Sequence, residues 1–123
     1  MPRPRKRRRV GRMPSRNFFK PQGVPLSELN SVILTVEGFE ALRLADALGL
    51  EQAEAAARMG VSRPTFSRIL AEARRTVAQA LAAGWAITIQ GGDYAIDERV
   101  DAPPRPARRG GWGRKRRDGK VYP

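Results

Sequence analysis

Six residues, most of them polar, gather at the start of a helical pattern near the middle of the chain, where they could bind nucleic acid. They lie in the stretch MGVSRPTFSRIL, Met59 to Leu70. Arginine can donate two hydrogen bonds to the O6 and N7 atoms of guanine, and serine or threonine can reach bases or phosphates. The predicted base-contacting residues are Ser62, Arg63, Pro64, Thr65, Ser67 and Arg68.

A helix-turn-helix motif would position these residues, because it exposes the start of the second of two closely crossing helices. The alanine-rich residues 52–59 predict the first of these helices, with Ala56 as the small residue where the two touch. Gly60 accepts the positive φ of a tight turn at little cost. Ser62 is a suitable N-cap for the next helix, which the apolar spacing extends to about residue 82. In this motif the exposed helix start enters the major groove of DNA.

A plain helical hairpin with a polar surface is the competing interpretation of the same stretch. No acidic residue stands between Glu54 and Glu72, whereas Arg58, Arg63 and Arg68 all lie in that interval. The stretch between the two glutamates is therefore purely basic, which favours a polyanionic partner over a merely solvated surface.

Phosphate contacts are predicted at two further places. Gln52, at the start of its helix, can reach a phosphate with its side chain or with the helix-end N–H groups. The N-terminal segment would neutralise phosphates through its basic side chains. Those predicted to do so are Arg5, Lys6, Arg7, Arg8, Arg9 and Arg12.

The charge is distributed unevenly along the 123 residues. The chain has 24 Lys and Arg against 12 Asp and Glu, a formal charge of +12. Residues 1–20 hold nine basic residues and no acid, and residues 101–123 hold eight basic and two acidic residues. Blocks of like charge repel, rarely fold and often bind polyanions. We therefore predict a basic arm at 1–22, a folded domain at 23–100 and a disordered basic tail at 101–123. The arm is expected to be mobile as far as Phe18 and Phe19, whose rings could dock on the core.

The predicted fold class is all-α, a three-helix helix-turn-helix core with a small C-terminal β-hairpin and disordered basic arms. Thr35 is placed to cap a first helix over residues 36–48, and Gly49 to end it. After Gly84 the pattern alternates in WAITIQ, and the dipeptide Gly91-Gly92 is typical of a hairpin turn. An isolated hairpin is marginally stable in water. The hairpin therefore either packs on the helices or joins two copies in a homodimer. It also occupies the place of the wing in winged-helix proteins, but its tip, residues 90–93, offers no basic group for DNA.

Five stretches together resemble a known protein family. They are MPRPRKRRRV, FKPQGVPLSEL, LTVEGFEALRLADALGL, MGVSRPTFSRILAEARRTVAQAL and IQGGDY, spread over about residues 1–94. The family is uncharacterised protein family 0251, small prokaryotic predicted DNA-binding proteins whose helix-turn-helix is similar to that of sigma factor region four. The resemblance implies DNA binding, in a transcriptional role, and leaves the biological targets unknown.

The composition argues against several other classes of protein. The chain has no cysteine and no histidine, which removes disulfides, thiolate nucleophiles, imidazole catalysis and the commonest metal ligands. Glu37, Glu40, Glu51 and Glu54 stand where helix-start and surface acids normally do. We therefore expect no enzymatic activity, no metal site and no cofactor. No apolar run approaches the roughly 18–20 residues that cross a bilayer, so we expect a cytoplasmic, nucleoid-associated protein without a membrane partner.

An RNA-associated protein is the alternative function. The stretch RRGGWGRKRR has the Arg/Gly character of RNA-binding tails, and Trp112 and Tyr122 could stack on bases. In that case the helical core would be a scaffold for the tails. The leading prediction remains sequence-specific binding of duplex DNA, as a transcriptional regulator.

Overall fold

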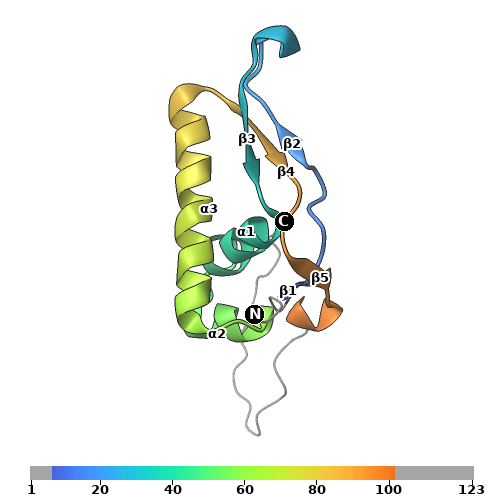
Figure 1. Cartoon of the computed structure of the whole chain (residues 1–123), viewed down its shortest axis with the longest axis vertical. Coiled ribbons are helices and arrows are strands. Elements are labelled where there is room, and N and C mark those ends of the chain that lie inside the picture. Colours follow the sequence, from blue (N-terminus) through green and yellow to red (C-terminus); the bar gives the residue numbers. More distant parts are fainter. Residues whose placement is uncertain (1–6, 102–123) are drawn as a thin grey trace, which may run out of the picture.

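Helices and strands are mixed in this protein, so the predicted all-α class is wrong. The computed structural model describes residues 7–101, in which three α-helices pack with two small β-sheets (Figure 1). The helices are α1 (Val36–Leu42), α2 (Gln52–Met59) and α3 (Arg63–Ala83). The strands are β1 (Arg8–Val10), β2 (Phe18–Phe19), β3 (Ser31–Leu34), β4 (Ala86–Ile89) and β5 (Tyr94–Ile96). Short 3₁₀ turns lie at Leu26–Glu28 and Glu98–Asp101.

The three helices begin and end close to the predicted positions, because local signals define their ends. The Thr35 hydroxyl accepts a hydrogen bond from the Gly38 N–H at 3.0 Å and caps α1, which continues into a π-helical turn at Arg43–Ala47. Gly60 ends α2 with φ +71°, and Gly84 ends α3 with φ +74°. A left-handed residue is the usual terminator of a helix and glycine adopts that conformation without strain.

The predicted C-terminal hairpin does not form. Strand β4 lies between β2 and β3 in a three-stranded sheet, antiparallel to β2 and parallel to β3. Strand β5 pairs instead with β1, in parallel. Gly91 and Gly92 do provide a turn with positive φ, but the turn carries the chain from one sheet to the other. The partners of both strands come from residues 8–34, which a local turn signal does not reveal.

The N-terminal segment is also more ordered than predicted. Its residues 8–10 and 18–19 form β1 and β2, and Val10 is completely buried. The strands satisfy their backbone hydrogen bonds on β5 and β4, which compensates for the high local charge. Residues 8–10 and 18–19 are therefore part of the fold, and the prediction of a mobile stretch before Phe18 is wrong for β1. Residues 1–6 and the predicted tail after residue 101 lie outside the described part.

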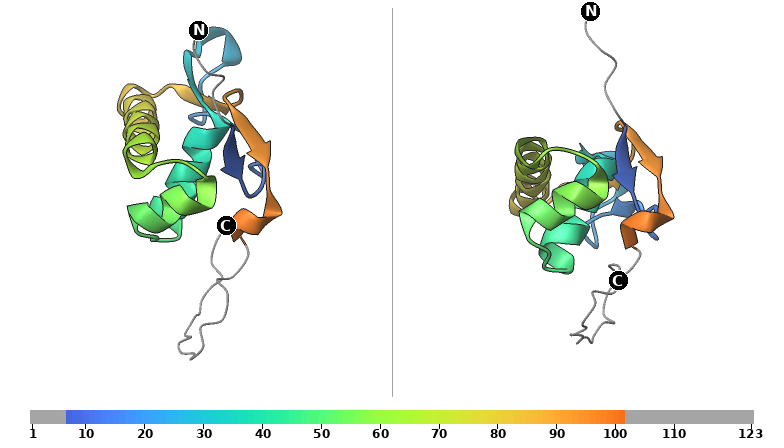
Figure 2. Two further views of the ribbon diagram at one scale, coloured as in Figure 1. Left: turned by 60° about the horizontal axis from the view of Figure 1, so that its bottom comes forward. Right: turned by 90° about the horizontal axis from the view of Figure 1, so that it is seen from below.

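Two apolar clusters form the core, and α3 contributes to both. The first packs α2 against α3 and includes Met59, Phe66 and Leu70. The second joins α1, α3 and the sheets, and includes Val10, Leu34, Val36, Ala73 and Ile89. Figure 2 shows α3 and the β1–β5 pair on opposite sides of α1 and α2. Because α3 is held near both its start and its middle, the orientation of its first turn is fixed. No helix within residues 7–101 has both the length and the apolar character to cross a membrane.

Candidate nucleic-acid interface

The turn between α2 and α3 is fixed by three local interactions. The Val61 N–H donates to the Ala56 carbonyl at 3.0 Å, which closes the end of α2. The Ser62 hydroxyl accepts a hydrogen bond from the Thr65 N–H at 3.2 Å, as an N-cap does. Val61 packs against the first apolar cluster, as the sequence predicted. These contacts determine where the first turn of α3 begins.

The structure brings the six predicted base-contacting residues together at the start of α3. Ser62, Arg63, Pro64, Ser67 and Arg68 are exposed, and Thr65 is half-buried beneath them. The Arg68 guanidinium lies 3.4 Å from the Thr65 hydroxyl, a long contact. Within residues 7–101 neither Arg63 nor Arg68 has an acidic partner. Both guanidinium groups are therefore available to a ligand.

The opposite side of the helix pair is closely packed. Ala55, Met59 and Phe66 are fully buried, and Ala56 is 2% exposed. Ala57, one position further on, faces solvent. The small side chain of Ala56 thus lies where the helices meet, as predicted.

Arg9 lies over the turn itself, although the sequence placed it in a mobile arm. Its guanidinium donates a hydrogen bond to the Ala57 carbonyl at 3.1 Å. A Cβ atom on Gly60 would come within 2.9 Å of the same guanidinium. The Arg9 side chain is 43% exposed, with Asp97 4.0 Å away. Pairing of β1 with β5 thus adds a cation to the end of α2, a placement that no local signal in the sequence indicated.

The other residues predicted to contact phosphates are dispersed. Arg7 is exposed, Gln52 is half-buried in the first turn of α2, and Arg12 is exposed but bonded to Asp101. Arg8 is buried instead, with its guanidinium 4.0 Å from Glu37 and 3.7 Å from Asp93. The remaining two, Arg5 and Lys6, lie outside the described residues.

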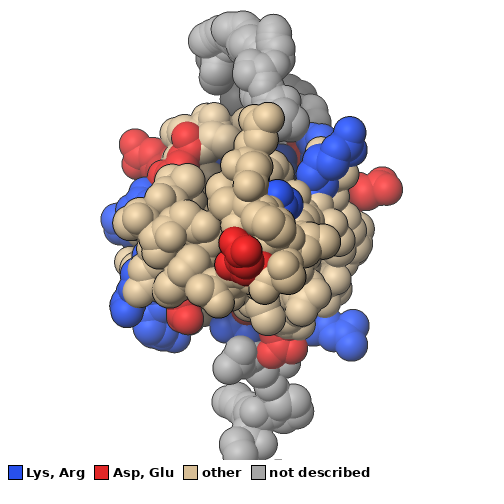
Figure 3. All heavy atoms as spheres, turned by 90° about the horizontal axis from the view of Figure 1, so that it is seen from above, with Lys and Arg blue, Asp and Glu red and all other residues tan. Residues whose placement is uncertain are grey.

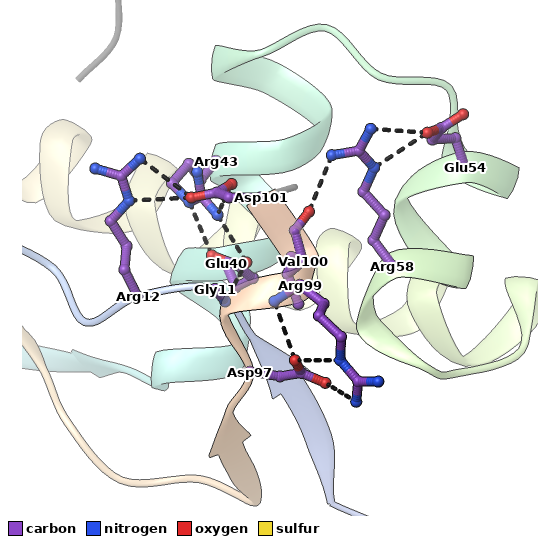
Figure 4. Close-up of polar contacts among 10 residues, drawn as sticks. All are labelled: Gly11, Arg12, Glu40, Arg43, Glu54, Arg58, Asp97, Arg99, Val100 and Asp101. Carbon is purple, nitrogen blue, oxygen red and sulfur yellow. Dashed lines mark hydrogen bonds and ion pairs between the residues drawn. The ribbon is translucent and has the colours of Figure 1, made fainter. Parts of the chain in front are cut away.

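A buried ion-pair network fastens the backbone after β1 and the last 3₁₀ turn to α1 (Figure 4). The Glu40 carboxylate, fully buried, accepts hydrogen bonds from the Gly11 N–H and from two nitrogens of Arg43, each at 2.8 Å. Arg43 also contacts Asp101 at 2.9 Å, and Arg12 reaches the same carboxylate at 3.1 Å. The sequence placed Glu37 and Glu40 on the surface, yet both are buried. Their role is to hold β1 and the last 3₁₀ turn against the helices.

Burial and pairing act on the pKa values in this network in opposite directions. Burial lowers the pKa of Arg43, but its hydrogen bonds to Glu40 and Asp101 and their charges raise it above its ordinary value. Burial raises the pKa of Asp101, and the hydrogen bonds and charges of Arg43 and Arg12 lower it by more, to below its ordinary value. Both groups are therefore more firmly charged than free side chains.

A second link joins α2 to the last 3₁₀ turn. The Arg58 guanidinium donates to the Val100 carbonyl at 2.9 Å and pairs with Glu54 at 3.0 Å (Figure 4). Arg58 is therefore occupied, unlike the arginines at the start of α3.

The end of the molecule opposite to α2 differs in charge from the surface at the start of α3. Figure 3 views the end opposite to α2, with the 3₁₀ turn Leu26–Glu28 and the end of α3, and most of that face is uncharged. An acidic group lies near its centre with a small basic patch close to it, and further basic and acidic groups lie around its edge.

Comparisons with known proteins identify relatives without assigning a function. The profile of a family described as protein of unknown function DUF134 matches residues 1–97. A UPF0251 protein of Rhodospirillum rubrum is 57% identical over 109 residues, which cover 89% of this chain and 76% of that protein. A UPF0251 protein of Thermoanaerobacter pseudethanolicus is 52% identical over 118 residues, covering 94% of this chain and 99% of that one. No solved structure matches the chain.

Proposed function

The chain belongs to the DUF134 family, and we propose that this member binds duplex DNA in a sequence-specific manner through a helix-turn-helix formed by α2, residues 60–62 and α3. In this role it is a transcriptional regulator associated with the nucleoid in the cytoplasm. It acts as a binding protein and not as an enzyme.

The observation that carries the proposal is the exposed start of α3. Arg63 is the first residue of α3 and Arg68 lies about one and a half turns further along. Neither has an acidic partner in the described part of the chain. Helix α3 has 21 residues, or roughly 30 Å, so its first turns can enter a major groove while the rest packs on the core. The inner face of α3 is held by the core, and its outer face carries guanidinium and hydroxyl groups. Groups of this kind can read bases.

Positioning on the duplex would come from neighbouring donors. Arg9 lies beside the turn between α2 and α3, and Gln52 lies in the first turn of α2, at the other end of that helix. Contacts of this kind fix the register of a protein on DNA and carry little sequence information. In this proposal, residues at the start of α3 contact bases and residues elsewhere on the surface contact phosphates.

The first experiment identifies the preferred site by selecting bound fragments from random duplex DNA. Arg63→Ala and Arg68→Ala are then measured on that site and on a random duplex. We expect each to weaken binding to the preferred site by about 1–3 kcal/mol, and binding to random DNA by much less. Equal losses on both duplexes would mean that the two residues contact phosphates and do not read bases.

Arg75→Ala is the matched control. Arg75 is exposed on the same helix, seven residues or about two turns beyond Arg68. We expect its replacement to leave the selected sequence unchanged. Competition by a structured RNA distinguishes the RNA-associated alternative: if RNA displaces duplex DNA from the protein at equal concentration, the preference for DNA is refuted.

A further inference from the structure

A groove lies between the segment that joins β1 to β2 and the helix α1 with its π-helical turn. Its volume is about 580 Å³, which falls within the roughly 300–1,000 Å³ of small-molecule sites. The apolar side chains that line it include Met13, Phe19, Phe39, Leu42 and Ala47. Met13 is 47% exposed and Phe19 is 53% exposed. The groove thus presents an apolar surface, partly aromatic, to solvent.

Most of the charged groups along the groove already have partners. Asp46 accepts two hydrogen bonds from Arg74, at 3.0 and 2.7 Å, so its negative charge is compensated. Those bonds hold the pKa of Asp46 below its ordinary value. Arg12 and Arg43 belong to the ion-pair network described above. None of these groups needs a ligand for its charge.

Arg16 is the exception along this groove. Its guanidinium donates to the carbonyl of Ser15 at 3.1 Å, and it has no acidic partner among residues 7–101. It lines the groove beside the apolar side chains. A ligand that satisfies both features has an apolar body and one negative charge.

We propose that the groove binds a small aromatic carboxylate, whose ring contacts Phe19 and Phe39 and whose carboxylate pairs with Arg16. Aromatic rings pack favourably on one another, and arginine can bind a carboxylate through two parallel hydrogen bonds. The site is independent of the proposed DNA interface, and its test contains no DNA. It goes beyond DNA binding by assigning the protein a small-molecule ligand.

The test titrates full-length protein with 2-naphthylacetate and with its neutral amide, 2-naphthylacetamide, in a calorimeter. We expect the acid to bind about tenfold more tightly than the amide, because only the acid gains a charged hydrogen bond. Arg16→Gln should abolish this difference while leaving the affinity for the amide unchanged. Equal affinity of the wild type for acid and amide would overturn the proposal.

Ala47→Phe examines the groove itself. Ala47 is exposed at the end of the π-helical turn, so a larger side chain enters the groove without disturbing the core. We expect loss of binding for both compounds with an unchanged melting temperature. Ala82→Phe, on the exposed surface of α3, is the control and should bind like the wild type. If Ala47→Phe binds the acid and the amide as the wild type does, the groove is not a small-molecule site. The same conclusion follows if sedimentation shows that the substitution changes only the oligomeric state.

Discussion

Individual charged residues in this protein have roles that depend on burial more than on sequence neighbourhood. Arg8 and Arg9 are adjacent, yet Arg8 is 9% exposed beside two carboxylates and Arg9 lies over the turn between α2 and α3. Alternation along β1 explains the difference, since successive side chains of a strand point to opposite faces. One cation is therefore buried in the fold, while its neighbour lies beside the proposed interface, bonded to the Ala57 carbonyl.

Asp101 allows a test of the buried network at the residue scale. Its folded pKa lies below the ordinary value of 3.8, so the stability it contributes is fully present above that value. That contribution is lost as the pH falls through the lowered folded pKa. Asp101→Asn should lower the free energy of unfolding by about 1 kcal/mol at pH 7, and the difference from the wild type should shrink in acid below about pH 4. Denaturant unfolding at a series of pH values measures both effects.

The exposed pair of Asp46 and Arg74 is the control for this measurement. Its two hydrogen bonds resemble those of Asp101, but both side chains are about half exposed. Asp46→Asn should therefore cost less than Asp101→Asn, since water screens the pair. Equal losses of unfolding free energy for the two variants would show that the network around Asp101 stabilises the fold no more than a surface pair does.

The contact between α2 and α3 provides a prediction at the scale of elements. Ala56 is buried at the crossing and Ala57 faces solvent. Ala56→Leu should overpack the crossing and cost about 1–3 kcal/mol. Ala57→Leu should be close to neutral, because the Ala57 carbonyl that binds Arg9 remains in the backbone. Thermal unfolding of both variants measures the difference, and equal melting temperatures would contradict this packing.

The helices could be predicted from the sequence because short-range chemistry defines them. Ser62 caps α3 and Gly60 ends α2, and each signal lies within a few residues of its effect. The same signals place the six candidate residues at the exposed start of α3. That part of the candidate site follows from the sequence.

The sheets could not be predicted in the same way, because their partners are distant in the sequence. Arg8 pairs with Tyr94 and Ser31 with Ala86. The run RKRRRV indicates a solvated arm if charge alone is considered, and Gly91-Gly92 indicates a hairpin if only the local turn is considered. Burial of Val10 and the acids around Arg8 override both indications. Hence the position of Arg9, and the groove between the β1–β2 connection and α1, emerge only from the fold.

At the scale of the whole molecule, the folded part and the chain ends differ sharply in charge. Residues 7–101 carry a net charge of +2, whereas residues 1–6 and 102–123 together carry +10. Eleven of the 24 basic residues thus lie in these two end segments. In the sequence, the first segment is followed by Arg7 and then by β1, whose Arg9 lies at the turn of the proposed interface.

This distribution predicts different roles for the end segments and the folded part in DNA binding. Contacts of the end segments should be mainly with phosphates, and each should add about 0.9 to the slope of log affinity against log salt. A chain reduced to residues 7–101 keeps every helix and strand. It should show a slope flatter by several units and select the same sequence, through α3. A salt titration of both proteins on specific and random duplexes measures the slopes.

The control for this experiment is the folded state, since trimming at residue 20 instead would remove β1 and β2. The reduced chain should melt within a few degrees of the full chain, because Glu40, Arg43 and Asp101 are all retained. If it remains folded but loses its sequence preference, the end segments read the DNA, as minor-groove arms do. In that case α2 and α3 would be a scaffold, and the role proposed for Arg63 and Arg68 would have to be abandoned.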